Sequence, residues 1–163
     1  MKRYVHKTMQ SPVGRLKLIG SGAGLAAILW DADERKGRVR IDPGEEHQTH
    51  PVLRKAETQL NEYFTGKRKT FSLKLDLIGT AFQKKVWRAL LKIPFGETRT
   101  YAEIARTIGH PNAARAVGAA NGKNPISVIA PCHRLVGSTG ALRGFAGGLE
   151  TKANLLRMEA DRH

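Results

Sequence analysis

Hydrophobic and polar residues alternate within the first thirty residues of the chain, with the period of two that is typical of β-strands. The clearest alternation covers residues 15–20, and a continuous apolar segment covers residues 25–30. Turn sequences that contain glycine and serine precede both segments, at residues 11–14 and 21–24. This pattern predicts an antiparallel hairpin or meander at the start of the chain.

The next part of the chain is polar and leads into one helix. Residues 31–48 are rich in charged and polar side chains, which predicts a loop or a poorly ordered crossover. Pro51 then fits the first position of a helix, Thr49 or His50 fits its cap, and Gly66 fits its end. Apolar residues at helical spacing give this helix one apolar face.

A change from strand-like to helical periodicity divides the chain into two parts. Residues 71–77 alternate once more and predict a short strand. After them, Thr80 with Gln83 and Thr100 with Glu103 have the spacing of capping boxes, in which two side chains satisfy free N–H groups at a helix start. The pattern thus predicts two helices that begin beside Thr80 and Thr100.

A third predicted helix follows the second after a tight turn. The turn contains Gly109 and ends at Asn112, which fits the cap of a helix from Ala113 to about Ala120. Two helices joined by a short glycine-containing turn form a helix-turn-helix arrangement. We therefore predict an α/β N-terminal domain with a small antiparallel sheet over residues 1–79, and a mainly α-helical winged helix-turn-helix domain over residues 80–163.

The charge of the chain suggests a partner. The chain has 28 Lys and Arg residues against 14 Asp and Glu residues, a net charge of +14. The excess is shared, because residues 1–79 carry a net +6 and residues 80–163 a net +8. Such a surface attracts polyanions, of which nucleic acid is the commonest, although solubility with non-specific adhesion is the plainer interpretation.

Two classes of protein are not favoured by the sequence. No stretch of about 18 apolar residues is present, so no membrane span is predicted. The first residues lack the apolar core of a secretory signal, and the chain has a single cysteine. We therefore expect a cytoplasmic protein with a reduced thiol.

The third predicted helix is unusual for a helix that reads DNA. Its residues are small except for Arg115, so few groups could bond to base edges in the major groove. One interpretation is a small-residue helix packed in a core. The other is a helix thin enough for its backbone to approach the minor groove, with Arg115 filling the gap that an extruded nucleotide leaves.

The single cysteine, Cys132, lies in the sequence Pro131-Cys132-His133-Arg134. A lone thiol can form neither an internal disulfide nor a multi-cysteine metal site. A buried inert residue is its ordinary interpretation, whereas the adjacent imidazole favours a nucleophile whose proton the histidine removes. Neighbouring side chains diverge in an extended segment, so a turn or a bridging water would have to connect the two groups.

The run from Asn112 to Arg134 closely resembles the O6-alkylguanine-DNA alkyltransferase (methylated-DNA–protein-cysteine methyltransferase) family, and the resemblance covers about residues 80–160. The N-terminal half matches that family mainly in its layout, in which the first domain is ribonuclease H-like. The resemblance implies DNA repair: the protein flips O6-alkylguanine, and also O4-alkylthymine, out of duplex DNA. It then transfers the alkyl group irreversibly to its own cysteine, once per molecule and without a cofactor.

The resemblance also implies roles for single residues. Cys132 is the acceptor nucleophile, His133 its base through a water molecule, and Glu159 the carboxylate that orients this histidine. Tyr101 assists the leaving guanine, and Asn124 is the hinge between the recognition helix and the active-site segment.

DNA contacts are expected mainly from the third helix and the residues that follow it. Arg115 replaces the flipped base, and the other expected contacts are Ala114, Ala116, Gly118, Asn121, Lys123 and Arg134. The partner is double-stranded DNA, approached from the minor groove by a monomer or by molecules clustered along the duplex; no membrane partner is expected.

Some features depart from the family's pattern without removing a central catalytic group. The departures are Leu135, Arg143, Phe145, Asn154 and Met158. Some relatives bind a metal through N-terminal cysteine and histidine ligands; those thiols are missing here, so no metal is expected.

Two other functions remain open. A catalytically idle relative could recognise the lesion and recruit other repair factors, although the presence of Cys132 argues against it. A winged-helix regulator could sense redox state through the same thiol, although the alanine-rich helix argues against readout of a DNA sequence.

Overall fold

The computed structural model describes residues 3–31, 33, 37–140, 145 and 147–162. The chain forms two compact units, one up to Ile78 and one from Gly79 onward. No helix in the described part of the chain combines the length and the apolar character that a membrane crossing requires.

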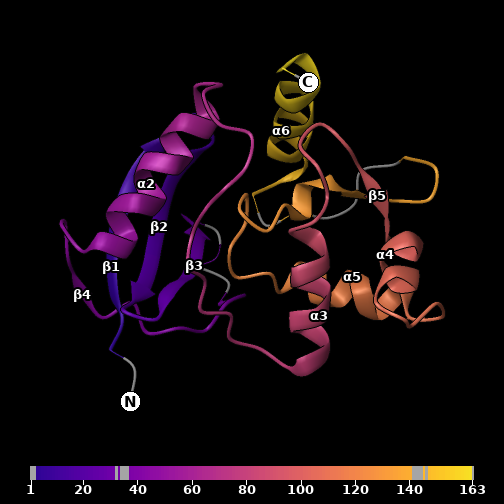
Figure 1. Cartoon of the computed structure of the whole chain (residues 1–163), viewed down its shortest axis with the longest axis horizontal. Helices are drawn as coiled ribbons and strands as arrows, with labels where there is room; N and C mark the ends of the chain where they lie inside the picture. Colours follow the sequence, from indigo (N-terminus) through magenta and orange to yellow (C-terminus); the bar gives the residue numbers. More distant parts are fainter. Residues whose placement is uncertain (1–2, 32, 34–36, 141–144, 146, 163) are drawn as a thin grey trace. The chain divides into compact units, whose positions relative to one another are not determined.

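The N-terminal unit is built on a four-stranded sheet with the order β3-β2-β1-β4 (Figure 1). The strands β1 (Val5–Ser11), β2 (Gly14–Ser21) and β3 (Gly24–Trp30) are antiparallel, which confirms the meander predicted from their alternation. The short strand β4 (Glu45–Glu46) lies parallel to β1 at the edge, so the sheet is mixed.

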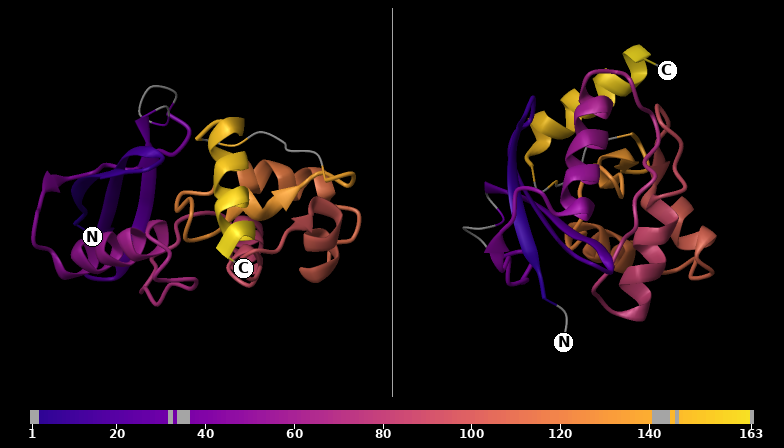
Figure 2. Two further views of the ribbon diagram at one scale, coloured as in Figure 1. Left: turned by 90° about the horizontal axis from the view of Figure 1, so that it is seen from above. Right: turned by 60° about the vertical axis from the view of Figure 1, so that its left-hand side comes forward.

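The helix α2 (Pro51–Phe64) lies against one face of this sheet, as Figure 2 shows. Its N-terminus is as predicted: Pro51 occupies the first turn, and Nδ1 of His50 accepts a hydrogen bond from Val52 N at 3.3 Å. The buried face contains Leu53, Leu60 and other residues at helical spacing. Burial of these side chains against the sheet forms the core of the unit.

The strand predicted over residues 71–77 is wrong. Within this segment Leu75 makes an isolated bridge to Leu25. Leu25 N donates to Lys74 O at 2.9 Å, and Asp76 N donates to Leu25 O at 2.8 Å. Alternate side chains still turn inward in this segment, which passes the end of β3. The alternation in the sequence therefore reflects burial on one side, and the repeated backbone pairing of a strand is not formed.

The C-terminal unit is mainly helical (Figure 1). Its elements in chain order are α3 (Ala81–Leu90), β5 (Arg99–Thr100), α4 (Tyr101–Thr107), α5 (Ala114–Gly122), the 3₁₀ turn η1 (Cys132–Arg134), β6 (Leu135–Val136) and α6 (Leu149–Arg162). The strands β5 and β6 pair in parallel, and α4 and α5 form the expected helix-turn-helix.

Both predicted capping boxes are present. Thr80 Oγ1 accepts from Gln83 N at 3.1 Å, while Thr80 N donates to Gln83 Oε1 at 3.0 Å. Thr100 and Glu103 repeat this exchange at 3.1 and 2.9 Å, and these bonds lower the pKa of the Glu103 carboxyl. Four backbone and side-chain groups at each helix start are thus paired.

The expected cap of the third helix, Asn112, is wrong. The helix α5 begins at Ala114, and its N-cap is Ala113, which makes no side-chain capping bond. The positive φ of Gly109 (83°) closes α4, because Gly109 N donates to Arg106 O and His110 N to Ala105 O. The turn between the helices is therefore set by backbone bonds at the end of α4.

Trp87 fixes α5 to α3 from the inner side. Its indole Nε1 donates to Ala120 O at 2.8 Å, and the ring is buried. The same ring lies so close to Gly79 that a Cβ atom there would be 2.6 Å from it. The bond to Ala120 holds the buried side of α5, which leaves the opposite side of the helix exposed.

We expect Thr80→Ala to lower the free energy of unfolding by about 1 kcal/mol, because Gln83 N loses its acceptor. Urea denaturation of the whole chain measures this. Thr98→Ala is the matched control, since Thr98 is exposed and a change at such a site stays within about 0.5 kcal/mol. Equal losses in the two variants would show that the capping box adds no stability.

Candidate active site

Asn124 shapes the segment that leads from α5 to the cysteine. The side chain is fully buried, and its Nδ2 donates to Ala130 O at 2.8 Å while its Oδ1 accepts from Ile126 N at 3.1 Å. A third bond joins Ala130 N to Ile126 O at 3.0 Å. The side-chain amide of Asn124 thus bonds to both ends of the loop, at Ile126 and at Ala130. These bonds are what the expected hinge residue contributes to the structure.

Val128 lies in the middle of this loop with a φ of +75°. A β-branched residue rarely adopts this left-handed conformation, which is strained by about 1–3 kcal/mol. The side chain is fully buried, so packing and the bonds of Asn124 hold the backbone in this form. The loop shape is therefore imposed by its surroundings.

Cys132 begins the 3₁₀ turn η1, where its side chain is 4% exposed. Cys132 N donates to Ala130 O at 2.7 Å, and Arg134 N donates to Pro131 O at 2.8 Å. The Sγ atom lies 4.0 Å from the Ser127 hydroxyl. This turn replaces the extended geometry in which the side chains of Cys132 and His133 would diverge.

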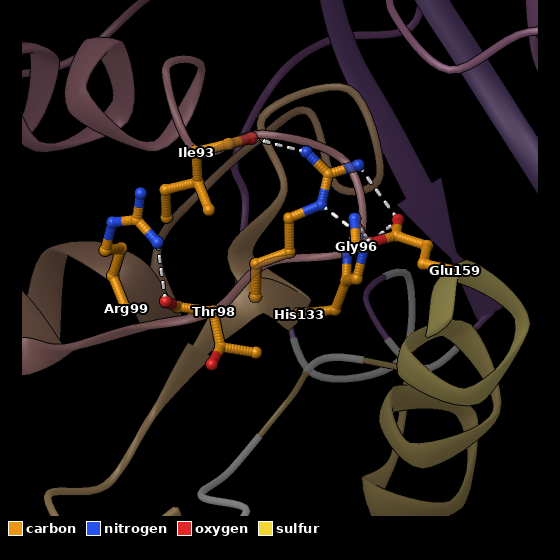
Figure 3. Close-up of polar contacts among 7 residues, drawn as sticks. Ile93, Gly96, Thr98, Arg99, His133 and Glu159 are labelled. Carbon is orange, nitrogen blue, oxygen red and sulfur yellow. Dashed lines mark hydrogen bonds and ion pairs between the residues drawn. The ribbon is translucent and has the colours of Figure 1, made fainter. Parts of the chain in front are cut away.

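His133 is fully buried and contacts Glu159 (Figure 3). Its Nε2 lies 2.8 Å from Glu159 Oε2. Burial lowers the pKa of His133, although the hydrogen bond and the charge of Glu159 oppose this effect. The imidazole is thus neutral, with Nε2–H donating to the carboxylate. Its Nδ1 has no hydrogen-bond partner among the described residues and keeps a free lone pair.

Arg134, expected to contact DNA, lies against the buried carboxylate of Glu159. This side chain is 5% exposed, and its guanidinium donates to both oxygens of Glu159 at 2.8 and 2.9 Å. The remaining branch donates to Ile93 O at 2.7 Å. Arg134 is therefore a partner of the buried carboxylate, and this burial argues against the expected DNA contact.

Lys152 is a residue of the site that the sequence interpretation missed. It is fully buried in α6, and its Nζ donates to Leu135 O at 2.6 Å. Burial lowers the pKa of Lys152, and the negative charge of Cys132 as a thiolate raises it. A signal existed in the sequence, because Lys152, Leu155 and Glu159 have the spacing of one buried helix face.

A pocket of about 570 Å³ opens between α4, α5 and the segment after β6. Its lining includes five residues expected at the site, namely Tyr101, Ala114, Arg115, Gly118 and Asn121, together with Ser138. The lining does not include Cys132 or His133. Gly118 lies beside Tyr101, whose ring would be 3.6 Å from a Cβ atom at that position.

The helix α5 presents mostly small residues to solvent. Ala116 and Ala119 are exposed, whereas Val117 and Ala120 are buried. Arg115 and Lys123 are also exposed, as expected for groups that could meet a phosphate backbone. Asn121 differs, because its side chain is 6% exposed and its Oδ1 has no hydrogen-bond partner among the described residues.

The departures from the family's pattern lie in different surroundings. The ring of Phe145 lies 6.5 Å from that of His133 in an edge-on arrangement. Leu135 is buried, Met158 is half-buried, and Asn154 is exposed, while Arg143 lies outside the described residues. No group of three or more potential metal ligands occurs among the described residues.

The burial of His133 predicts a pH dependence of stability. An unfolded histidine has its ordinary pKa of 6.5, whereas the pKa of folded His133 is lower. Stability is therefore full above pH 6.5 and falls as the unfolded chain takes up a proton below it, by at most about 1.4 kcal/mol per pH unit.

Chemical denaturation between about pH 5 and pH 8 measures this effect. The matched variant is His133→Gln, which keeps the other five histidines of the six in the chain. The unfolding free energy of this variant should depend less steeply on pH than that of the parent. Parallel profiles would show that His133 is protonated as readily in the fold as in the unfolded chain.

Two family models together match nearly the whole chain. Residues 4–77 match the ribonuclease-like domain of 6-O-methylguanine DNA methyltransferase, and residues 81–161 match its DNA-binding domain. The chain is 47% identical to the methylated-DNA–protein-cysteine methyltransferase of Methanosarcina mazei, over 96% of each chain. It is 46% identical to that of Mycobacterium tuberculosis, over 96% of this chain and 93% of the relative.

Solved structures agree with this match. The structure of Mycobacterium tuberculosis OGT in complex with DNA has a TM-score of 0.86 and 44% identity, covering 98% of this chain and 94% of that chain. A Pyrococcus kodakaraensis O6-methylguanine-DNA methyltransferase at 22% identity shares the fold, with a TM-score of 0.61 over 96% of this chain and 98% of that chain. These matches confirm the predicted fold class, and the chain belongs to the methylated-DNA–protein-cysteine methyltransferase family.

Proposed function

We propose that this protein repairs DNA by moving the alkyl group of O6-alkylguanine onto Sγ of Cys132. The observation that carries this proposal is the buried arrangement of Cys132, His133 and Glu159 in one turn and one helix. Family membership supports the same reaction, since the relatives are methylated-DNA–protein-cysteine methyltransferases. O4-alkylthymine is a second substrate on the same chemical grounds, because it also carries an alkyl group on an exocyclic oxygen.

The first step is removal of the thiol proton. A free thiol has a pKa of about 8.5 and is mostly protonated at neutral pH. The lone pair of His133 Nδ1 takes this proton through a water molecule, and Glu159 stabilises the imidazolium through Nε2–H. The ammonium of Lys152 adds positive charge to the same buried region, which favours the thiolate.

Transfer then exchanges one bond for another. The thiolate sulfur attacks the alkyl carbon, and the bond from that carbon to O6 breaks with its electron pair on the base. A hydrogen bond from the Tyr101 hydroxyl assists the departing guanine, which in the net reaction takes up the proton that the thiol has lost. The product on Cys132 is a thioether, and no described residue is placed to hydrolyse it, so each molecule reacts once.

DNA binding rests on α5 and the charge of the chain. The small residues of α5, namely the exposed Ala116 and the half-buried Ala114 and Gly118, let its backbone approach the minor groove closely. The net charge of +14 supplies affinity for phosphates that does not depend on sequence. The Mycobacterium tuberculosis OGT structure, solved in complex with DNA, supports DNA binding by the present chain.

Two residues of the pocket are assigned to the extruded nucleotide. Arg115 is exposed at the pocket and fills the gap left in the base stack. Asn121 lines the same pocket with an unpaired Oδ1, whose desolvation a donor group of the nucleotide would offset. Lys123, exposed after α5, is assigned to a phosphate.

We further infer a monomer that acts on double-stranded DNA in the cytoplasm, alone or in clusters along the duplex. Neither alternative function is favoured by the site. An idle lesion-binding relative would have no use for the buried Cys132, His133 and Glu159 arrangement. A sequence-specific regulator would need polar side chains on α5, whose exposed face is mostly small residues.

The parent protein should gain the mass of one methyl group after incubation with duplex DNA that contains O6-methylguanine. The gain should stop at one group per molecule, because Cys132 is the only cysteine in the sequence. Intact-mass spectrometry with peptide mapping measures this, and Cys132→Ser should gain nothing. Binding of the lesion without a mass increase would favour the idle relative instead.

Arg115→Ala should slow transfer from duplex DNA about 10- to 100-fold, because the gap opened by base flipping is no longer filled. Transfer from the free nucleoside O6-methylguanosine should change little, since no base has to leave a stack. Single-turnover rates on both substrates measure the difference. Arg106→Ala removes an exposed arginine of α4 and is the charge-matched control; an equal loss there would mean that charge alone matters.

A further inference from the structure

Ser127 places a hydroxyl group beside the reactive sulfur. The residue is 0% exposed, and its Oγ lies 4.0 Å from Cys132 Sγ. It belongs to neither the pocket lining nor the His133–Glu159 pair. A buried hydroxyl at this position therefore needs an account of its own.

The hydroxyl is held in place by the loop that carries it. Ser127 lies between Ile126, whose N–H is bonded to Asn124, and Val128, whose φ is +75°. The other end of the loop is joined to Asn124 through Ala130 O, and Ala130 O also accepts from Cys132 N. Ser127 and Cys132 are thus fixed to the same short framework.

The protonation state of the sulfur decides which group can donate. A neutral thiol can donate its hydrogen to Ser127 Oγ, whereas a thiolate can only accept. A thiolate formed in this buried site loses water and needs hydrogen-bond donors in its place. Rotation about the Ser127 C–O bond supplies such a donor without any movement of the backbone.

We propose that the Ser127 hydroxyl turns its hydrogen toward Cys132 Sγ once the thiol proton has left, and stabilises the thiolate until the sulfur attacks the alkyl carbon. This inference rests on the proposed function, in which Cys132 is the nucleophile. The proton itself goes to His133, and Ser127 keeps its own proton throughout. After transfer the thioether is a weak acceptor, so the hydrogen bond is lost with the product.

The proposal predicts a change in thiol reactivity that reverses with pH. Removing one hydrogen bond to a charged group should raise the Cys132 pKa by about one unit in Ser127→Ala. The variant then has about tenfold less thiolate below both pKa values, but each thiolate is about threefold more nucleophilic. Its alkylation should therefore be about threefold slower at low pH and about threefold faster at high pH.

The experiment follows carboxamidomethylation of the folded whole chain by iodoacetamide as a function of pH. Thiolate absorbance in the ultraviolet gives the pKa of Cys132 independently, and a single cysteine makes both signals specific. Ser127→Thr keeps the hydroxyl and should retain the parent pKa. Ser21→Ala deletes another buried serine hydroxyl, which accepts from Ala23 N, and should leave the thiol pKa unchanged.

Each outcome decides the question. A raised pKa and crossing rate profiles in Ser127→Ala, with the parent pKa in Ser127→Thr, support the proposal. A lowered pKa would mean that the hydroxyl accepts from the neutral thiol, and an unchanged pKa would mean that it does not bond the sulfur; both overturn it. Thermal melting identifies a variant that has lost its fold. The titration uses no DNA, so its result is separate from a failure of DNA repair.

Discussion

The carboxylate of Glu159 is the group on which the reactive end of the molecule depends. It is fully buried and shared between the His133 imidazole and the Arg134 guanidinium, with Gly96 N as a further donor at 3.3 Å. A buried anion of this kind is tolerated only when it is paired and its lone pairs are occupied. Arg134 neutralises the charge, which leaves the carboxylate free to orient a neutral histidine.

This arrangement also joins three segments that are far apart in the sequence. Glu159 comes from α6, Arg134 and His133 come from η1, and the guanidinium reaches back to Ile93 O, just after α3. Loss of one partner would leave an unpaired charge in the interior, which is far more costly than loss of a surface ion pair. The same group therefore contributes to the stability of the unit and to the state of the nucleophile's base.

Local signals in the sequence predicted most of the elements. Both capping boxes, the cap of α2 and the three-stranded meander depend on residues close together in the chain, which is why short patterns found them. The strand predicted over residues 71–77 was wrong. Alternation of apolar and polar residues shows that one side of a segment is buried, but it does not show whether the segment pairs as a strand or makes a single bridge, here to Leu25. The predicted start of α5 was also wrong. Asn112 is a residue type that often caps helices, but the backbone bonds at the end of α4 determine where the turn ends and α5 begins.

The sequence predicted which residues form the site better than it predicted how they are arranged in space. The motif around Cys132 identified the nucleophile and its histidine, yet the burial of Arg134 depends on Glu159, 25 positions away. Lys152 was missed although it shares the helical spacing of Leu155 and Glu159, because a lysine is not expected on a buried face, and Ser127 was missed because an isolated serine carries no local pattern. Their positions follow from the packing of α6 and from the strained loop at Val128, both of which are tertiary effects.

The glycine at the junction of the two units has a consequence for how the family can diverge. Linkers between compact units normally drift freely in composition, since few contacts restrain them. At Gly79 any side chain would collide with the buried ring of Trp87, whose indole also holds α5. Substitution of Gly79 is therefore restricted, although linker positions ordinarily tolerate substitution well. A mutation at this junction would disturb packing in the way that a core mutation does.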